Sequence, residues 1–487
     1  MDYFNFELEI GARNGDVYPV SVVRSAEGEA NETMHFPFGE QTLATQLVTL
    51  QQFLANPGPG DSLLPSPGEQ SIQKFGEALF TALFTGEIGI LYEVSRAIAR
   101  NKGKGLRVKL RIQPPELAAL PWEFLYDPRH EQYLCLSDDT PVVRYLDIPE
   151  PLEPLTVDSP LSILGMTANP KDITDLDVAR EQKRIEAALA GLQAEGLVQI
   201  TWLTGHTWMD LQQALLRGSW HVFHFIGHGG FNATTREGVI ALEDAAGQAR
   251  YLSASQLARL LADHHPLRLV VLNSCKGAAS STRDIFSSTA ATLVRRGIPA
   301  VLAHQYTISD QASIALSRTF YEALAAGLPV DASVAEARKA ISLGGTPSLE
   351  WGTPVLCTHT PDGVLFTASQ STPPSSGPLV ASPVIAAPAK LPFSALPPSP
   401  SSLSVPVTTP DPPSAISSTT RTTEPVAIMI SQKPGKTAPE ARPSDSLATI
   451  KRSPLKGIPL LYIILLVLIL VVLLESVAII MLLHLLH

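Results

Sequence analysis

Two apolar runs that stop abruptly at small residues stand out in the hydrophobic pattern of this chain. The first, residues 220–226, is followed by Gly-His-Gly-Gly, and the second, residues 267–272, is followed by Asn-Ser-Cys-Lys-Gly. Each run has the length of a buried strand and ends in turn-forming residues. The pattern therefore predicts two buried strands whose carboxyl ends carry His228 and Cys275.

Strands and helices alternate on both sides of these runs. The periodicity predicts strands at 161–166, 197–203, 300–303 and 355–357, and helices at 178–192, 209–216, 286–296, 311–325 and 334–341. This alternation is typical of an α/β fold with a mostly parallel sheet that helices cover on both faces. Ligand sites in such sheets lie at the carboxyl edge. If the two runs form neighbouring strands, His228 and Cys275 face each other across a cleft at that edge.

The N-terminal part of the chain shows strand-like alternation at both ends. Residues 4–10 and 17–23 flank Asn14 and Gly15, two residues that tolerate positive φ, so the pattern predicts a β-hairpin. Helical patterns follow at 41–54, 72–84 and 88–99. Residues 106–112 alternate apolar with basic side chains, which predicts a half-exposed strand whose basic stripe is a solvated face.

Composition divides the chain into domains. Between residues 370 and 450 lie 17 of the 41 prolines, with many Ser, Thr and Ala and no sustained periodicity, which predicts a disordered linker. We therefore expect an N-terminal accessory region at 1–105, the α/β domain at 106–368, the linker at 369–456 and a C-terminal segment at 457–487.

The C-terminal segment has the composition of a transmembrane helix. Residues 458–474 are uncharged and would span about 25 Å as a helix, against a hydrocarbon core of roughly 30 Å. Lys451, Arg452 and Lys456 precede it, and basic residues flank the cytoplasmic ends of such helices. The N-terminus has no signal-peptide pattern. We therefore expect a single-pass membrane protein with a C-terminal anchor and its catalytic domain in the cytoplasm.

Charge and cysteine usage narrow the function classes. The net charge is −10, which gives no sign of nucleic-acid binding. The three cysteines, Cys135, Cys275 and Cys357, are odd in number and far apart, so they form no disulfide framework and suit a reducing compartment. We expect Cys135 and Cys357 to be packing residues, which leaves Cys275 as the candidate for chemistry.

His228 and Cys275 have the chemistry of a catalytic dyad. A thiol reacts as the thiolate, and a neighbouring imidazole can take its proton and later protonate a leaving amine. The backbone N–H groups of Gly229 and Cys275 are placed to hold the oxyanion, because glycine lets the backbone approach closely. The alternative is structural, with Cys275 as a small buried residue and His228 as a turn residue.

A metal site is the main rival to the dyad. His221, His224 and His228 are close in sequence, but residues three apart on a strand point to opposite faces, and no carboxylate stands at ligand spacing. The sequence also has no Gly-x-Ser-x-Gly elbow, Walker loop or zinc-type cysteine pair. We therefore expect no metal and no other cofactor, with His224 as a hydrogen-bonded core residue.

Several segments resemble the CHAT domain family, whose relatives include caspases and separases. They are residues 224–229 and 272–278 at the two turns, Leu-Pro-Trp-Glu at 120–123, residues 293–301, and Ile-Ser-Asp at 308–310. The resemblance covers roughly residues 106–366. It implies a caspase-like fold and, as in competent members, cysteine endopeptidase activity with His228 as base and Cys275 as nucleophile. Many relatives have an acidic residue after the cysteine, where this chain has Lys276; an ammonium there would lower the pKa of the thiol.

Asp310 follows the strand predicted beside the cysteine strand. Its carboxylate could line the specificity pocket for the residue before the scissile bond and favour a basic side chain. It could equally cap the helix that begins at Gln311. The sequence leaves both roles open.

These features predict a membrane-tethered cysteine endopeptidase that cleaves a protein substrate after a trigger. The expected partners are that substrate, the membrane and a regulatory protein, and no nucleic acid is expected. The alternative is a catalytically silent CHAT module that serves as a membrane-bound scaffold or signalling adaptor. The presence of both His228 and Cys275 favours the enzyme.

Overall fold

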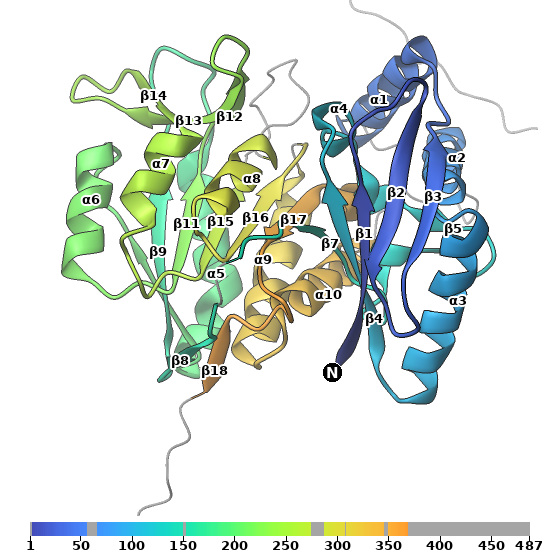
Figure 1. Cartoon of the computed structure of the whole chain (residues 1–487). Coiled ribbons are helices and arrows are strands. Elements are labelled where there is room, and N and C mark those ends of the chain that lie inside the picture. Colours follow the sequence, from blue (N-terminus) through green and yellow to red (C-terminus); the bar gives the residue numbers. More distant parts are fainter. Residues whose placement is uncertain are drawn as a thin grey trace, which may run out of the picture. The chain divides into compact units, whose positions relative to one another are not determined.

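A computed structural model describes residues 2–55, 66–149, 152–273, 287–306, 308–344 and 349–368 (Figure 1). Cys275, the predicted linker at 369–456 and the predicted membrane segment at 457–487 lie outside these residues. Within the described part, no single helix is long and apolar enough to cross a membrane. Two helices, α2 (Pro67–Leu83) and α3 (Gly86–Asn101), meet that requirement only together, and the pair is bent by 102°.

The described chain is built on one sheet of 11 strands, seven of whose neighbouring pairs are parallel. In spatial order the strands are β10 (Val198–Trp202), β9 (Leu161–Thr167), β11 (Val222–Ile226), β15 (Leu269–Asn273), β16 (Ala300–His304), β17 (Pro354–Thr358), β7 (Val142–Tyr145), β4 (Gly105–Ile112), β1 (Tyr3–Ile10), β2 (Val17–Arg24) and β3 (Ala30–His35). The predicted α/β class with a mostly parallel sheet is confirmed.

Helices cover both faces of the part of the sheet that contains β11 and β15 (Figure 1). Alternate residues of these strands enter two different cores: Val222 and Val271 pack with α5 (Val178–Ala194) and α9 (Asp310–Ala325). Phe223 and Val270 pack instead in the core that contains residues of α6 (Trp208–Arg217), α7 (Ala254–Leu261) and α8 (Ser287–Arg295). Burial on both faces explains why these strands are continuous apolar runs in the sequence.

Smaller elements complete the fold. The antiparallel strands β12 (Gly229–Asn232), β13 (Glu237–Glu243) and β14 (Ala249–Ser253) lie beyond the carboxyl ends of β11 and β15 (Figure 1). Two-stranded pairs form between β8 (Leu155–Val157) and β18 (Phe366–Ala368), and between β5 (Tyr126–Asp127) and β6 (Gln132–Tyr133). The remaining helices and turns are α1 (Glu40–Ala55), α4 (Pro115–Ala118), α10 (Val330–Ser342), η1 (Trp122–Phe124), η2 (Leu134–Leu136) and η3 (Leu349–Gly352).

The N-terminal strands belong to the same sheet as the rest. The predicted hairpin is present, with β1 antiparallel to β2, and β1 also pairs with β4 along all eight residues. The described residues all belong to one compact unit. The division predicted at residue 105 therefore falls at the first residue of β4, in the interior of the sheet; the functional domain limits stay a prediction.

The prediction that residues 106–112 form a half-exposed strand is wrong. Arg107 and Lys109 are buried, at 3% and 1% exposure. Strand β4 lies between β1 and β7, and partners within the fold replace the solvent: Lys109 Nζ is 3.2 Å from Glu7 Oε1. Burial lowers the pKa of Lys109, and the Glu7 carboxylate opposes that shift. Charged and apolar residues alternate in β4 because one buried face of the strand is polar and the other is apolar.

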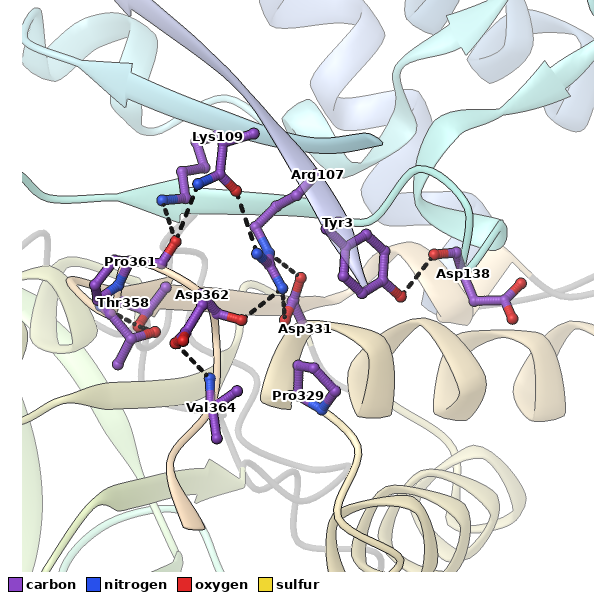
Figure 2. Close-up of polar contacts among 12 residues, drawn as sticks. Tyr3, Arg107, Lys109, Asp138, Pro329, Asp331, Thr358, Pro361, Asp362 and Val364 are labelled. Carbon is purple, nitrogen blue, oxygen red and sulfur yellow. Dashed lines mark hydrogen bonds and ion pairs between the residues drawn. The ribbon is translucent and has the colours of Figure 1, made fainter. Parts of the chain in front are cut away.

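Figure 2 shows how β4 holds the segment that leads to β18. Arg107 Nη2 donates to the carboxylate of Asp331 on α10 at 3.2 Å and to the carbonyl of Asp362 at 2.7 Å. Lys109 Nζ donates to the carbonyl of Pro361 at 2.7 Å. These charge-assisted bonds connect the first part of the chain to the end of the α/β domain.

Candidate active site

The two predicted catalytic residues follow strands β11 and β15 in the sequence. The two strands are adjacent, parallel and in register, and their last paired residues are Ile226 and Asn273. The Gly227 N–H donates to the Asn273 carbonyl at 3.3 Å, so contact continues one residue past the strands. His228 and Cys275 each follow two residues after the last pair. The two strands that precede the predicted catalytic residues are therefore neighbours; Cys275 itself lies outside the described residues, and the pairing of the two side chains stays a prediction.

Gly227 is required by the close approach of the chain at this point. A Cβ at this position would lie 2.6 Å from Cζ of Phe225 and 3.0 Å from the carbonyl oxygen of Ala168. The Ala168 N–H in turn donates to the carbonyl of Ile226 at 3.0 Å. The turn that carries His228 is thus fixed between β15 and the segment after β9.

His228 is half-buried, and its ring has one defined partner. Its Nε2 lies 2.7 Å from the carbonyl oxygen of Thr174, in the loop between β9 and α5. A carbonyl only accepts, so Nε2 carries the proton, and Nδ1 of the neutral ring keeps its lone pair. Burial lowers the pKa of His228, while the bond to Thr174 opposes that shift. The neutral ring is the form that a general base requires.

Strand β12 begins directly after His228 and orients the next backbone N–H. Gly229 is paired with Ile240, and the Ala241 N–H donates to the His228 carbonyl at 3.0 Å. This bond makes His228 and Ala241 a hydrogen-bonded pair, so the next pair in the antiparallel ladder, Gly229 and Ile240, is a non-hydrogen-bonded one. The N–H groups of such a pair point away from the partner strand. The Gly229 N–H therefore points away from β13, as an oxyanion donor would have to.

Asp310 is the first residue of α9, but it does not cap the helix. The N-cap is Ser309, whose side chain accepts from the Ala312 N–H, so the capping alternative for Asp310 is wrong. The Asp310 carboxylate lies 2.5 Å from Arg184 Nη1 and 3.6 Å from Arg180 Nη2. It is 45% exposed. Its role in substrate selection stays a prediction, and any basic substrate group would have to share this carboxylate with α5.

A buried polar cluster under the end of β15 was not predicted from the sequence. The Glu181 carboxylate on α5 accepts from the Ser313 hydroxyl and from Asn273 Nδ2, the latter at 3.4 Å. Asn273 Nδ2 also lies 3.3 Å from Ser313 Oγ. All three residues are buried. An acidic residue in the first turn of a predicted helix usually faces solvent, so only the packing of α5 on the sheet reveals this contact.

The neighbouring histidines have separate roles. His224 is fully buried on β11, and its Nδ1 lies 2.8 Å from the Tyr321 hydroxyl, which confirms the predicted core histidine. His304 on β16 is also fully buried, with Nδ1 3.2 Å from the Leu272 carbonyl. His221 Nδ1 accepts from the Ser162 N–H at 3.0 Å. The cluster of histidines in the sequence is therefore distributed over different partners.

One group in the described part of the chain has the spacing of metal ligands, namely Glu93, Asp127 and His130. Arg129 lies between two of its members, with Nη2 2.9 Å from Glu93 and Nε 3.2 Å from Asp127. Arg96 Nη1 is 3.8 Å from the second Asp127 oxygen. Because two guanidinium groups already neutralise the carboxylates, the cluster is a structural ion-pair network that disfavours a further cation.

The family model of the CHAT domain matches residues 73–362, more than half of the chain. The chain belongs to the CHAT domain family. The matched range begins within α2, so it includes part of the predicted accessory region as well as the whole site. The module is thus a caspase-like, protease-related one. The sequence matches none of the curated proteins with which it was compared.

Among solved structures, the chain is similar to two crystal structures of the Saccharomyces cerevisiae separase-securin complex, at 2.6 Å and 3.0 Å resolution. The identities are 10% and 12%, the TM-scores 0.41 and 0.39, and the alignments cover 75% and 73% of this CHAT chain. They cover 30% of the matched chain, so this protein corresponds to less than a third of its length. At these TM-scores the similarity supports no conclusion about the function of this chain.

Proposed function

We propose that this CHAT protein is a cysteine endopeptidase that uses His228 and Cys275 and is tethered to a membrane by its C-terminal segment. The observation that carries the proposal is the in-register pairing of β11 and β15, continued by the bond from Gly227 to Asn273. It supports the proposal because His228 and Cys275 each stand two residues after the last paired residues in the sequence. Membership of the CHAT family supports the same reading.

The proposed mechanism follows from the tautomer of His228. Nδ1 takes the proton of the Cys275 thiol, and the thiolate attacks the carbonyl carbon of the scissile peptide bond. The backbone N–H groups of Gly229 and Cys275 stabilise the oxyanion. The imidazolium then protonates the leaving amine as the C–N bond breaks, which leaves a thioester on Cys275. Water, deprotonated by His228, hydrolyses the thioester and restores the thiol. The Thr174 carbonyl holds the Nε2 proton throughout.

Substitution of either dyad residue tests this mechanism. Cys275→Ala and His228→Ala should each abolish peptide cleavage. His206→Ala is a matched control, because His206 is also half-buried and its Nδ1 also bonds a backbone carbonyl, Thr167 O, at 2.7 Å. The control should keep its activity. Full activity in either dyad variant would remove the mechanism.

A thiol-reactive peptide electrophile separates the enzyme from a silent scaffold. The active enzyme should be trapped at Cys275 near neutral pH, and His228→Ala should slow trapping because the thiol loses its base. A wild-type chain with no cleavage and no trapping would instead support a CHAT module that acts as a scaffold or adaptor.

The membrane part of the proposal rests on the sequence alone. Residues 458–474 are uncharged and apolar, and the basic residues before them favour the cytoplasmic side for the rest of the chain. A cytoplasmic location suits a free catalytic thiol, since the compartment is reducing. A protein substrate and a regulatory protein partner are part of the proposal.

A further inference from the structure

Helix α5 and the loop before it contact the residues that follow three neighbouring strands. The Thr174 carbonyl binds His228, which follows β11. Glu181 accepts from Asn273, the last residue of β15. The Arg184 guanidinium binds Asp310, which follows the strand β16. One segment of chain therefore contacts His228 after β11, the last residue of β15 and the first residue of α9, and Glu181 is its buried central contact.

Glu181 differs from an ordinary surface glutamate in its burial and in its partners. It is 5% exposed although it lies in the first turn of α5. One carboxylate oxygen, Oε1, accepts from the Ser313 hydroxyl and from Asn273 Nδ2. The other, Oε2, lies 3.5 Å from Arg184 Nη1. A buried carboxylate is tolerated because hydrogen bonds and a cation satisfy it, and those bonds are directional.

Asn273 gives this contact a direct relation to both proposed catalytic turns. Its side chain is held by Glu181 and Ser313, while its carbonyl accepts from the N–H of Gly227, the residue before His228. Asn273 also precedes Cys275 by two residues. A shift of the Asn273 backbone would therefore move the end of β15 relative to the turn that carries His228.

We propose that Glu181 is a positioning residue of this peptidase: through Asn273 it fixes the end of β15 against the turn that carries His228. The inference rests on the proposed function and adds a residue to it. Glu181 has no contact with substrate in this role. Its effect is on geometry, and a misplacement of reacting groups by about 1 Å can cost on the order of 100-fold in rate.

Steady-state kinetics of three variants test the role. Glu181→Ala should lower kcat by about 10- to 100-fold and change KM for a short peptide by less than about threefold. Glu181→Gln should recover most of the rate, because an amide oxygen can still accept from Ser313 and Asn273. Glu186→Ala is the matched control on the same helix: Glu186 is only part-buried, bonds Gln182 of its own helix, and its removal should leave kcat unchanged.

A double-mutant cycle separates positioning from general destabilisation. Asn273→Ala should reproduce the fall in kcat, and the Glu181→Ala, Asn273→Ala double variant should be no slower than the slower single variant, because the two residues act in one chain of contacts. Independent, multiplying losses would overturn the inference. Asn273→Ala leaves Glu181 bonded to Ser313 and Arg184, so it keeps the test valid if Glu181→Ala unfolds.

Alkylation of Cys275 distinguishes failure of this inference from failure of the proposed function. The rate is measured by mass spectrometry with iodoacetamide between pH 5.5 and 9; Cys135 and Cys357 are buried and serve as internal references. We expect a reactive Cys275 near neutral pH in the wild-type chain and an ordinary pH profile in Glu181→Ala. Equal reactivity in both would overturn the positioning role and leave the peptidase standing. An unreactive wild-type thiol would overturn both.

Discussion

Two histidines of the central sheet have pKa values that are set by their burial. His224 and His304 lie on the strands to either side of β15, and burial lowers their pKa values to about 3 and about 4. Both rings are therefore neutral in the folded chain at any pH near 7. In the unfolded chain they titrate near pH 6.5. Folding is thus linked to pH through two core imidazoles.

The pH linkage gives a prediction for His224. Below pH 6.5 the unfolded chain binds protons that the folded chain does not, so stability falls as the pH drops from about 6.5 towards 3. At pH 5 each buried ring lowers the free energy of unfolding by about 2 kcal/mol relative to neutral pH. His224→Gln, which can still bond the Tyr321 hydroxyl, should reduce the acid loss by about that amount. Urea unfolding at pH 5 and 7 measures it, and identical losses in both chains would contradict the prediction.

Gly227 gives a second prediction at this scale. Gly227→Ala places a methyl group against Phe225 and the Ala168 carbonyl, so we expect a loss of about 1–3 kcal/mol in unfolding free energy. The peptidase rate should fall too, because the turn before His228 has to move. Gly230→Ala is the control for stability: its Cβ would meet only Val239 Cγ2, at 3.8 Å. A Gly227→Ala chain as stable as the control would show that the turn adapts freely.

At the scale of elements, buried ion pairs join segments that are distant in sequence. Glu123, in the Leu-Pro-Trp-Glu segment, is 1% exposed and pairs with Arg144 on β7 at 2.7 Å. Gln305, directly after β16, donates to the same carboxylate at 2.9 Å. Glu123 therefore anchors the chain beyond β16 as well as β7. The Arg107 and Asp331 pair in Figure 2 joins β4 to α10 in the same way.

Removal of one partner from such a buried ion pair should strongly lower the free energy of unfolding. Glu123→Ala removes the carboxylate that neutralises the buried Arg144 guanidinium, so the free energy of unfolding should fall by about 3–5 kcal/mol. The exposed Arg13 and Asp16 pair is the control, and Asp16→Ala should change stability by less than about 0.5 kcal/mol. Chemical unfolding measures both. Similar effects of the two substitutions would mean that Arg144 finds water or a new partner.

Some elements could be read from the sequence because their signals are local. The capping box of Ser253 and Gln256 is present at the start of α7, and Asn14 and Gly15 lie in the turn between β1 and β2. The burial of strand β4 could not be read in this way, although the strand itself was predicted. A basic stripe looks the same in sequence whether water or Glu7, Asp331 and two carbonyls compensate it.

At the scale of the whole molecule, the proposed anchor makes a prediction about location. The described chain ends in β18, which pairs with β8 just before β9 begins (Figure 1), and the proposed anchor follows it in the sequence. Deletion of residues 458–487 should release the chain from membranes into the supernatant with its peptidase activity intact. A truncated chain that still sediments with membranes would place the attachment elsewhere.

Protease protection tests the orientation of the proposed anchor. A tag at the N-terminus should resist protease added to intact cells and be digested after lysis, because the basic residues before the segment favour the cytoplasmic side. A tagged soluble protein of the cytoplasm is the control for cell integrity: its tag should also resist the protease until lysis. Digestion of the chain's tag before lysis would contradict the proposed topology.

By itself, the sequence determined the α/β class, the two buried strands and the turn before His228, because apolar runs and turn residues act over a few neighbours. Only the tertiary structure decided that β11 and β15 are in register, that Thr174 orients His228, and that Glu181 lies under Asn273. The structure also shows that the basic residues Arg107 and Lys109, predicted to lie on a solvated face, belong to a buried network of ion pairs and hydrogen bonds. These outcomes depend on contacts between groups that are tens of residues apart in the sequence. The free energy of a buried charge depends on the groups that surround it in the folded chain.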